Sequence, residues 1–213
     1  MQQFETLIRD ARGFLIRLKA DNSRNFFHAA KPEYDAKLKA PALELLAEAA
    51  PLITQITGHD CQTKLFRPQR DVRFAKDKTP YTTHLHMMWS LDAGGRDAPV
   101  CYFGIGLDYM SFGFGCMGMS KPVLETWRQL CDLDTARISA AAQSVSAAGF
   151  TFREPALKRV PQPYAKDHLL AQFLRMKSVS ASKELDPAQP PLPQITAALT
   201  EGLPFLKVIE SAL

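Results

Sequence analysis

The amino-acid sequence predicts an α+β fold, with a mainly antiparallel sheet from the middle of the chain packed by N- and C-terminal helices. Three observations favour this fold. Apolar residues at helical spacing fill the first quarter of the chain, short alternating segments separated by turns follow, and helical patterns return after residue 120. We expect one domain over residues 1–213, helical over 1–57, sheet-rich over 60–117, and helical and irregular over 120–213.

The first quarter is predicted to hold two helices. Residues 4–18 place apolar side chains at i, i+3 and i+4, which is the spacing of an amphipathic helix. Asn22 or Ser23 can end this helix and cap the next turn. A second helix is expected to start at Pro32, because proline is favoured in the first turn, and to run to about Thr57.

After Gly58 the sequence changes to short strands and turns. Residues 82–91 alternate between apolar and polar side chains, as a half-buried strand does. Aspartate and proline within 77–80 predict a turn before that strand. We therefore expect an extended segment at 65–75, the turn, the strand at 82–91, and a polar loop at 92–99.

Residues 100–117, VCYFGIGLDYMSFGFGCM, predict a β-hairpin. If its turn is centred on Asp108 and Tyr109, one face carries apolar residues for the core, and the other face carries four glycines and is nearly bare backbone. Glycine weakens a strand interior unless something must approach closely, so either a helix packs on this face or a ligand lies in a shallow groove there. The same register places Cys101 opposite Cys116, although reduced thiols are expected.

The C-terminal part is predicted to be helical and irregular. Ser120 and Asp134 can cap two helices, and Gly149 can end the second. A proline-spaced, extended connection follows. We expect helices at 122–131, 134–148 and 167–176, a short strand at 178–182, and a closing helix at 195–213 that is kinked near residues 202–204.

Composition excludes several classes of protein. With 213 residues, 46% hydrophobic and 23% charged, the chain has the composition of a soluble protein with a substantial core. The first residues show no basic-then-apolar signal, and no apolar run approaches the roughly 18 residues that span a bilayer. We therefore expect a cytoplasmic protein without a membrane partner.

Several motifs that carry chemistry are absent or out of context. The four cysteines have no CxxC spacing, which would indicate a zinc cage or a redox pair. Residues 113–118, GFGCMG, match GxGxxG but fall within the hairpin instead of after the first strand of a βαβ unit. No GxSxG or Ser/His/Asp order indicates a nucleophilic hydrolase. His84 and His86 have a spacing that can bind zinc or iron, but they need further ligands, so we assign no metal and leave cofactors unknown.

The densest charge lies in residues 66–81, FRPQRDVRFAKDKTPY. From Lys64 to Lys78 there are six basic and two acidic residues, a local net charge of +4 that equals that of the whole chain. Arginine presents planar donors that match carboxylate or phosphate oxygens, and lysine adds a mobile charge. Because charges on both faces of an extended segment need an edge or a cleft, we predict a pocket for a small anionic ligand, including phosphorylated ones. The expected anion-binding residues are Arg70, Arg73 and Lys78, joined from the C-terminal half by Lys158 and Arg159.

The sequence leaves it uncertain whether the protein is an enzyme. In an enzyme, Asp71 or Asp77 would be the candidate base, and Tyr81 would act as a hydrogen-bond donor or acid. These three residues are the predicted catalytic set.

Two other interpretations of the charged motif stay open. In the first, Asp71 with Arg73 and Asp77 with Lys78 form a structural salt-bridge network that holds a long loop. In the second, the protein is a non-catalytic interaction module that binds an acidic protein surface or nucleic acid. Nucleic acid is disfavoured because a compact +4 patch is small for tracking a phosphate backbone. The oligomeric state also stays open.

The segment RDVRFAKDKTPYTTH, residues 70–84, resembles the signature of the domain-of-unknown-function family 2461. The segments FLIRLKADNSRNFFHAAKPEYDAKLKAP and LKRVPQPYAKDHLLAQFLRMKS agree with it, so the resemblance covers nearly the whole chain. The family has no established activity, and the resemblance implies kinship and a set of matching positions. Thr82 stands where the family usually has lysine, so a site that uses this lysine would be weaker or differently tuned here. The matching positions are Arg70, Asp71, Arg73, Phe74, Asp77, Lys78, Pro80 and Tyr81.

Overall fold

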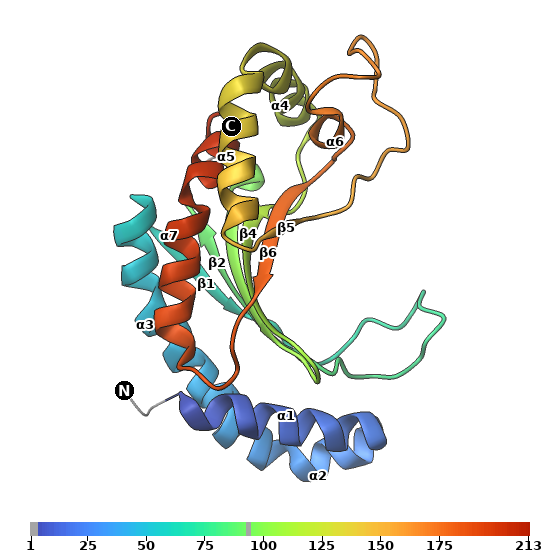
Figure 1. Ribbon diagram of the computed structural model, residues 1–213. Helices are drawn as coiled ribbons and strands as arrows, with labels where there is room; N and C mark the ends of the chain where they lie inside the picture. The colour runs from blue at the N-terminus through green and yellow to red at the C-terminus, as the bar shows by residue number, and fades with distance from the viewer. Residues whose placement is uncertain (1–3, 93–94) are drawn as a thin grey trace.

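The computed structural model describes residues 4–92 and 95–213 (Figure 1). Helices from both ends of the chain pack against an antiparallel sheet that is formed mainly by its middle, so the predicted α+β class is confirmed. Residues 93 and 94 of the expected 92–99 loop lie outside the described residues. No helix within the described ranges is long and apolar enough to cross a bilayer.

One antiparallel sheet of six strands, in the order β1-β2-β3-β4-β6-β5, is formed by the described residues. The first four strands neighbour one another in chain order, and β6 then pairs with β4 on one side and with β5 on the other. The sheet expected from residues 60–117 is therefore completed by two strands from the C-terminal half. The strands are β1 (Cys61–Leu65), β2 (Leu85–Leu91), β3 (Val100–Ile105), β4 (Met110–Cys116), β5 (Thr151–Phe152) and β6 (Val179–Glu184).

The N-terminal quarter is helical, as predicted, but its second helix begins earlier than Pro32. The hydroxyl of Ser23 accepts a hydrogen bond from the backbone N–H of Phe26 at 3.1 Å, so Ser23 is the N-cap. Pro32 therefore lies inside the helix, which continues through a π-helical turn. Gly58, with φ of 81°, ends the run. The elements are α1 (Glu5–Ala20), α2 (Arg24–Tyr34), the π-helical turn (Asp35–Lys39) and α3 (Ala40–Thr57).

The later helices agree with the sequence pattern, with shifted ends. Gly149 follows the second of them with φ of 89°, as expected for a glycine stop. The helix expected at 167–176 is only one turn long, and the closing helix starts at Pro191 instead of residue 195. The elements are a 3₁₀ turn (Gly95–Asp97), α4 (Lys121–Leu133), α5 (Thr135–Ala147), α6 (Ala171–Leu174) and α7 (Pro191–Glu210).

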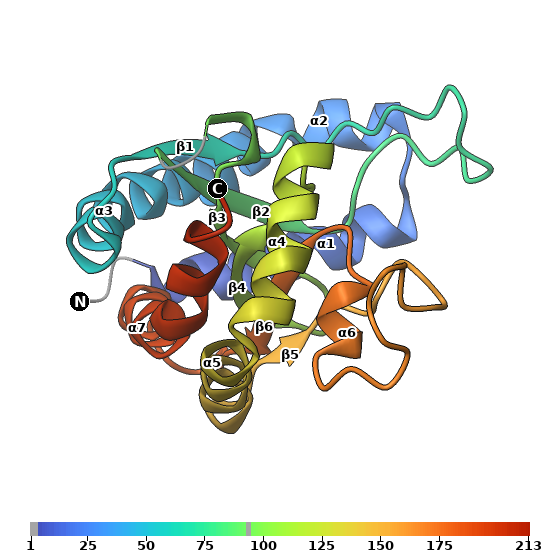
Figure 2. The same ribbon diagram turned by 90° about the horizontal axis from the view of Figure 1, so that it is seen from above.

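Helices α3 and α7 pack on one face of the sheet, and α5 lies beside α7 (Figure 1). The buried Trp89 of β2 donates its indole N–H to the carbonyl of Leu46 in α3 at 3.0 Å. Gly202 of α7 lies against the ring of Phe114, where a Cβ would stand 2.2 Å from the ring. The opposite face is flanked by two long loops, 66–84 and 153–170, which project from the same side of the molecule (Figure 2).

The hairpin of β3 and β4 has the predicted faces but a different register. The observed pairs include Cys101 with Phe114 and Ile105 with Met110, because the turn is centred on Leu107 and Asp108. The register is shifted by two residues from the prediction, and a shift of two leaves every side chain on its expected face. Cys101 is therefore not opposite Cys116, and the cysteines of the chain are free.

The prediction of an extended segment at 65–75 is wrong after residue 65. Strand β1 ends at Leu65, and an irregular loop follows to residue 84. Pro68 has no backbone N–H for a strand ladder, and the aspartates after it bind nearby backbone N–H groups. The charged motif therefore lies on a loop.

Candidate functional site

Loop 66–84 closes on itself at its base. The backbone N–H of Arg70 donates to the carbonyl of Pro80, and that of Thr82 donates to Pro68, both at 2.8 Å. Gln69 and Tyr81 form an antiparallel bridge between these two bonds. The two ends of the loop are thus paired by a short antiparallel ladder of backbone hydrogen bonds, and the residues between them form its tip.

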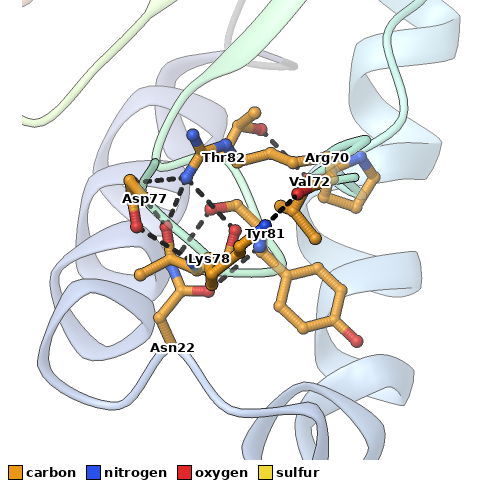
Figure 3. A network of polar contacts seen from close by, with 9 residues as sticks. Asn22, Arg70, Val72, Asp77, Lys78, Tyr81 and Thr82 are labelled. Atoms are coloured by element: carbon orange, nitrogen blue, oxygen red, sulfur yellow. Dashed lines mark hydrogen bonds and ion pairs between the residues drawn. The ribbon is translucent and has the colours of Figure 1, made fainter. Parts of the chain in front are cut away.

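Arg70 and Asp77 form the central ion pair of this loop (Figure 3). Arg70 Nη1 lies 2.5 Å from Asp77 Oδ2 and also contacts the hydroxyl and the carbonyl of Thr79. The backbone N–H of Thr79 in turn donates to Asp77 Oδ1 at 2.9 Å. The partner of Asp77 is therefore Arg70, whereas the sequence had suggested Lys78 for the structural network.

The other two predicted anion-binding residues of the loop also have partners. Arg73 Nη2 lies 2.7 Å from Asp71 Oδ2, and both side chains are largely exposed. The ammonium group of Lys78 donates to the carbonyls of Val72 and Arg73, at 3.1 and 3.4 Å. Arg73 thus forms an ion pair with a carboxylate of its own loop, and Lys78 donates hydrogen bonds to backbone carbonyls of the same loop.

Tyr81 and Asn22 fasten the base of the loop to the helices. The Asn22 side chain donates to the Tyr81 carbonyl and accepts from its N–H, each at 3.0 Å (Figure 3). The Tyr81 ring stacks on Phe27 of α2, with ring centroids 4.2 Å apart. The role of Asn22 carried no signal in the sequence beyond its expected place at a helix end.

The electrostatics of the loop do not favour acid–base chemistry by its carboxylates. Hydrogen bonds from Thr79 and Arg70 lower the pKa of Asp77 from 3.8 to about 2. A hydrogen bond from Arg73 likewise lowers the pKa of Asp71. A base with a pKa far below neutral takes up a proton weakly. The catalytic roles of Asp71, Asp77 and Tyr81 stay predictions.

Lys158 and Arg159 lie elsewhere, in a cavity of about 1060 Å³ formed by the second long loop and α6. None of the motif residues of loop 66–84 lines this cavity. Its walls include no aspartate or glutamate. The polar and charged lining is Lys158, Arg159, Gln162, Tyr164, Lys166 and Arg175.

The loop around this cavity is held in place by the rest of the fold. The backbone N–H of Leu157 donates to the carbonyl of Arg175 at 3.0 Å, which brings the two ends of the segment together. Trp127 and Arg128 of α4 donate to the carbonyls of Phe173 and Leu174, each at 3.2 Å. The cavity is thus built on α4 and α6.

Acidic groups lie next to the cavity but outside its lining. Asp132 of α4 lies 3.4 Å from Nε2 of His168. Burial raises the pKa of Tyr164, and Asp132 adds to this shift. The hydroxyl of Tyr164 therefore stays protonated at neutral pH and can donate a hydrogen bond.

The glycine-rich face of the β3–β4 hairpin receives aromatic rings of the same sheet. A Cβ on Gly113 would stand 2.2 Å from the ring of Tyr102, and one on Gly104 would stand 2.8 Å from the ring of His86. Gly106 is covered in the same way by Tyr109. Of the two alternatives for this face, the packed helix is not observed at these three glycines, because rings of neighbouring residues cover their backbone.

His84 and His86 stack on each other, with ring centroids 3.8 Å apart. Nε2 of His86 is hydrogen-bonded to the hydroxyl of Tyr109 at 2.7 Å. Burial, with a smaller contribution from His84, lowers the pKa of His86 to about 4, so its imidazole is neutral at pH 7. In residues 4–92 and 95–213, no group of three or more His, Cys, Asp or Glu side chains is arranged to hold a metal ion.

The protein thus belongs to the α+β class. Helices cover one face of its antiparallel sheet, and two long basic loops lie beside the other face (Figure 1). Within that class, residues 10–208 match the family described as conserved hypothetical protein (DUF2461), and the chain belongs to this family. The resemblance found in the sequence is thereby confirmed. A search of curated proteins gave no match.

Proposed function

We propose that this protein binds a small, multiply charged anion, such as a phosphorylated metabolite, in the cavity formed by the second long loop and α6. One observation carries the proposal. Four basic side chains line the cavity, and three of them, Lys158, Arg159 and Lys166, make no ion pair with any described residue. The fourth, Arg175, uses only its Nε, which donates to the carbonyl of Ala171 at 3.2 Å.

Cations that gather without counter-charges repel one another, and a bound anion removes this repulsion. Arginine and lysine together suit phosphate oxygens, since the guanidinium group binds two oxygens at once and the ammonium group supplies a point charge. The Tyr164 hydroxyl adds a neutral donor. The volume of about 1060 Å³ slightly exceeds the roughly 300–1,000 Å³ of typical small-ligand sites, so the cavity has room for a ligand larger than a single phosphate.

Thermal unfolding with pyrophosphate as the probe tests this site. At 100 times its dissociation constant, a ligand of the folded state adds about 2.7 kcal/mol of stability, which raises the melting temperature measurably. We expect the double variant Lys158→Gln/Arg159→Gln to lose this increase while it keeps the melting temperature of the free protein, because both side chains are exposed. The same measurement with sugar phosphates and with nucleotides then shows which of these classes of anion raises the melting temperature.

The variant Arg73→Ala is the matched control, because it removes an exposed arginine from the charged loop. We expect it to keep the pyrophosphate effect. Loss of the effect in Arg73→Ala alone would move the site to loop 66–84, as the sequence first suggested. No effect with any of the anions would contradict anion binding altogether.

The tip of loop 66–84 favours a second candidate function, which is binding of an acidic macromolecular surface. Phe74 is 96% exposed, and the guanidinium carbon of Arg73 lies 5.9 Å from the centroid of its ring. An exposed aromatic residue between cations suits an acidic protein surface better than a small ligand, which needs a concave site. Under this candidate, pyrophosphate has no effect on any variant.

A further inference from the structure

The open face of the sheet carries a groove of about 650 Å³ that is separate from the basic cavity. The strand register explains its course. On this face Lys64, Met88, Tyr102, Gly113, Ser182 and Thr151 stand side by side, one from each strand of the sheet. Neighbouring strands lie about 4.8 Å apart, so a row of this kind spans roughly 24 Å. The groove follows this row and therefore suits an elongated ligand.

Most of the groove is apolar, and Gly113 helps to keep it open. The ring of Tyr102 lies over the backbone of Gly113 instead of standing up from the sheet. A larger residue at position 113 would lift the ring into the groove. The apolar lining includes Phe66, Met88, Val100, Met117 and Phe152.

The charges of the lining are all positive. Lys64 and Arg153 are its only ionisable groups besides His86 and Tyr102, and no aspartate or glutamate is among the lining residues. The His86 imidazole is hydrogen-bonded to Tyr109 and is neutral at pH 7. The groove therefore complements an apolar molecule with an anionic group.

The end of the groove at β5 and β6 is the better place for that anionic group. The backbone N–H of Arg153 donates to the carbonyl of Ser180 at 2.9 Å, which holds this residue beside β6. Its guanidinium group makes no hydrogen bond or ion pair within the described part of the chain. The Tyr102 hydroxyl donates to the Ala181 carbonyl at 3.4 Å and is hydrogen-bonded to the side chains of Ser182 and Ser180, so this end of the groove is its polar end.

The opposite end, at β1, is less suited. The Lys64 ammonium group lies 4.9 Å from the centroid of the Phe66 ring, and its strand neighbour on this face is Met88. No hydroxyl group of the lining lies on β1 or β2. This end of the groove suits the apolar part of a ligand.

We infer that the groove binds an elongated monocarboxylate, with the carboxylate at Arg153 and the apolar chain along Tyr102 and Met88 toward Phe66. The ligand is distinct from the multiply charged anion of the basic cavity. The two sites share no lining residue, so we expect them to fill independently.

Calorimetric titration of the full chain with decanoate, at neutral pH and below its micelle concentration, tests this inference. Decanol supplies the chain without the charge, and acetate supplies the charge without the chain. We expect decanoate to bind, acetate not to bind, and decanol to bind at least about tenfold more weakly than decanoate, because a charge-assisted hydrogen bond is lost. Equal affinity for decanoate and decanol, or no binding of decanoate, would overturn the inference.

Two variants locate the carboxylate. Arg153 and Lys64 are both exposed, so neither Arg153→Gln nor Lys64→Gln should disturb the fold. Arg153→Gln should lower the affinity for decanoate by about tenfold or more and leave that for decanol unchanged. Lys64→Gln should change both by less than about threefold. A large loss in Lys64→Gln alone would overturn the orientation.

Methyl resonances of labelled methionines give a readout of position. Met88 and Met117 line the groove, whereas Met176 is buried outside it. Decanoate should shift the resonances of Met88 and Met117 and leave that of Met176 in place, and the same shifts should appear with pyrophosphate present. Saturation without a shift of Met88 or Met117 would show that the ligand binds elsewhere.

Discussion

Two glycines of β4 make room for different neighbours. Gly113 gives space to the ring of Tyr102, which is a side chain and can move. Gly115, with φ of 145°, faces the backbone of β6, and a Cβ there would stand 2.2 Å from the carbonyl oxygen of Val179. A backbone held in a sheet cannot withdraw as a ring can. Gly115 is therefore the position at which the close approach of strands requires glycine.

We expect Gly115→Ala to lower the free energy of unfolding by about 2–4 kcal/mol, since it combines backbone strain with a steric clash. Denaturant unfolding measures this change. Gly118→Ala is the matched control, because a Cβ at Gly118 meets no atom within 4 Å. A loss of stability at Gly115 no larger than at Gly118 would contradict the close approach of β4 and β6.

At the residue scale, the alternation of side chains along β3 and β4 was enough to predict the two faces of the hairpin. It did not predict which residues of the two strands pair with each other. Leu107 and Asp108 form the turn, whereas the sequence pattern was symmetrical enough to favour Asp108 and Tyr109. Arg153, Ser180 and Ser182 could not be placed near the glycine face at all. Their place depends on which edge of the sheet β6 joins, and a short strand pattern does not contain that information.

At the scale of elements, loop 66–84 shows how local hydrogen bonds compete with strand formation. The alternating charges near Asp71 and Arg73 fitted an extended segment, but the aspartates bind the backbone N–H groups of Arg73 and Thr79. The loop thus pairs part of its dense charge within itself. Its internal ion pairs favour the structural interpretation for Arg70 and Asp77.

We expect Asn22→Ala to loosen this loop, because it removes both hydrogen bonds to the backbone of Tyr81. The loss should be about 1–2 kcal/mol in global stability, and trypsin should cleave at the loop lysines and arginines faster than in the parent protein. Limited proteolysis followed by mass spectrometry measures the cleavage.

Asn25→Ala is the matched control, since Asn25 is exposed on α2 and makes no side-chain hydrogen bond within the described residues. It should leave the cleavage rate unchanged. If Asn22→Ala behaved like Asn25→Ala, the loop would be held by the stacking of Tyr81 on Phe27 instead.

At the scale of the whole molecule, stability should depend on pH through His86, the half-buried histidine of the open face. The pKa of His86 falls from 6.5 to about 4 on folding, so between these values the unfolded chain binds more protons than the folded one. Stability is thus complete above about pH 6.5 and decreases as the pH falls toward 4. His84 acts in the same direction, because burial also lowers its pKa.

His86→Gln isolates this contribution. We expect the parent protein to lose about 2 kcal/mol more than the variant between pH 7 and pH 4, after allowance for the partial exposure of the imidazole. Chemical unfolding at a series of pH values measures the difference. Asp71 and Asp77 have lowered pKa values and also make stability depend on pH. Both proteins contain them, so their contribution cancels in the difference between the two curves of stability against pH. Parallel curves would show that His86 is not desolvated.

The α+β class, the helical ends and the hairpin were accessible from the sequence because each rests on local periodicity. The sites were less accessible. Lys158 and Arg159 were expected to join Arg70 and Arg73 in one pocket, but the cavity that they line includes neither Arg70 nor Arg73. Distances between segments far apart along the chain depend on sheet order, which the pattern of single elements does not encode.

The insertion of β6 beside β4 also sets the order in which the molecule can be completed. Strands β1 to β4 pair with neighbours along the chain, whereas β4 and β6 join residues more than 60 positions apart. Such distant contacts form late, because a long stretch of chain must be ordered first. During synthesis, β4 therefore keeps an unpaired edge until β6 has left the ribosome. Over that interval the growing chain offers an unpaired strand edge at which wrong strand pairing can begin.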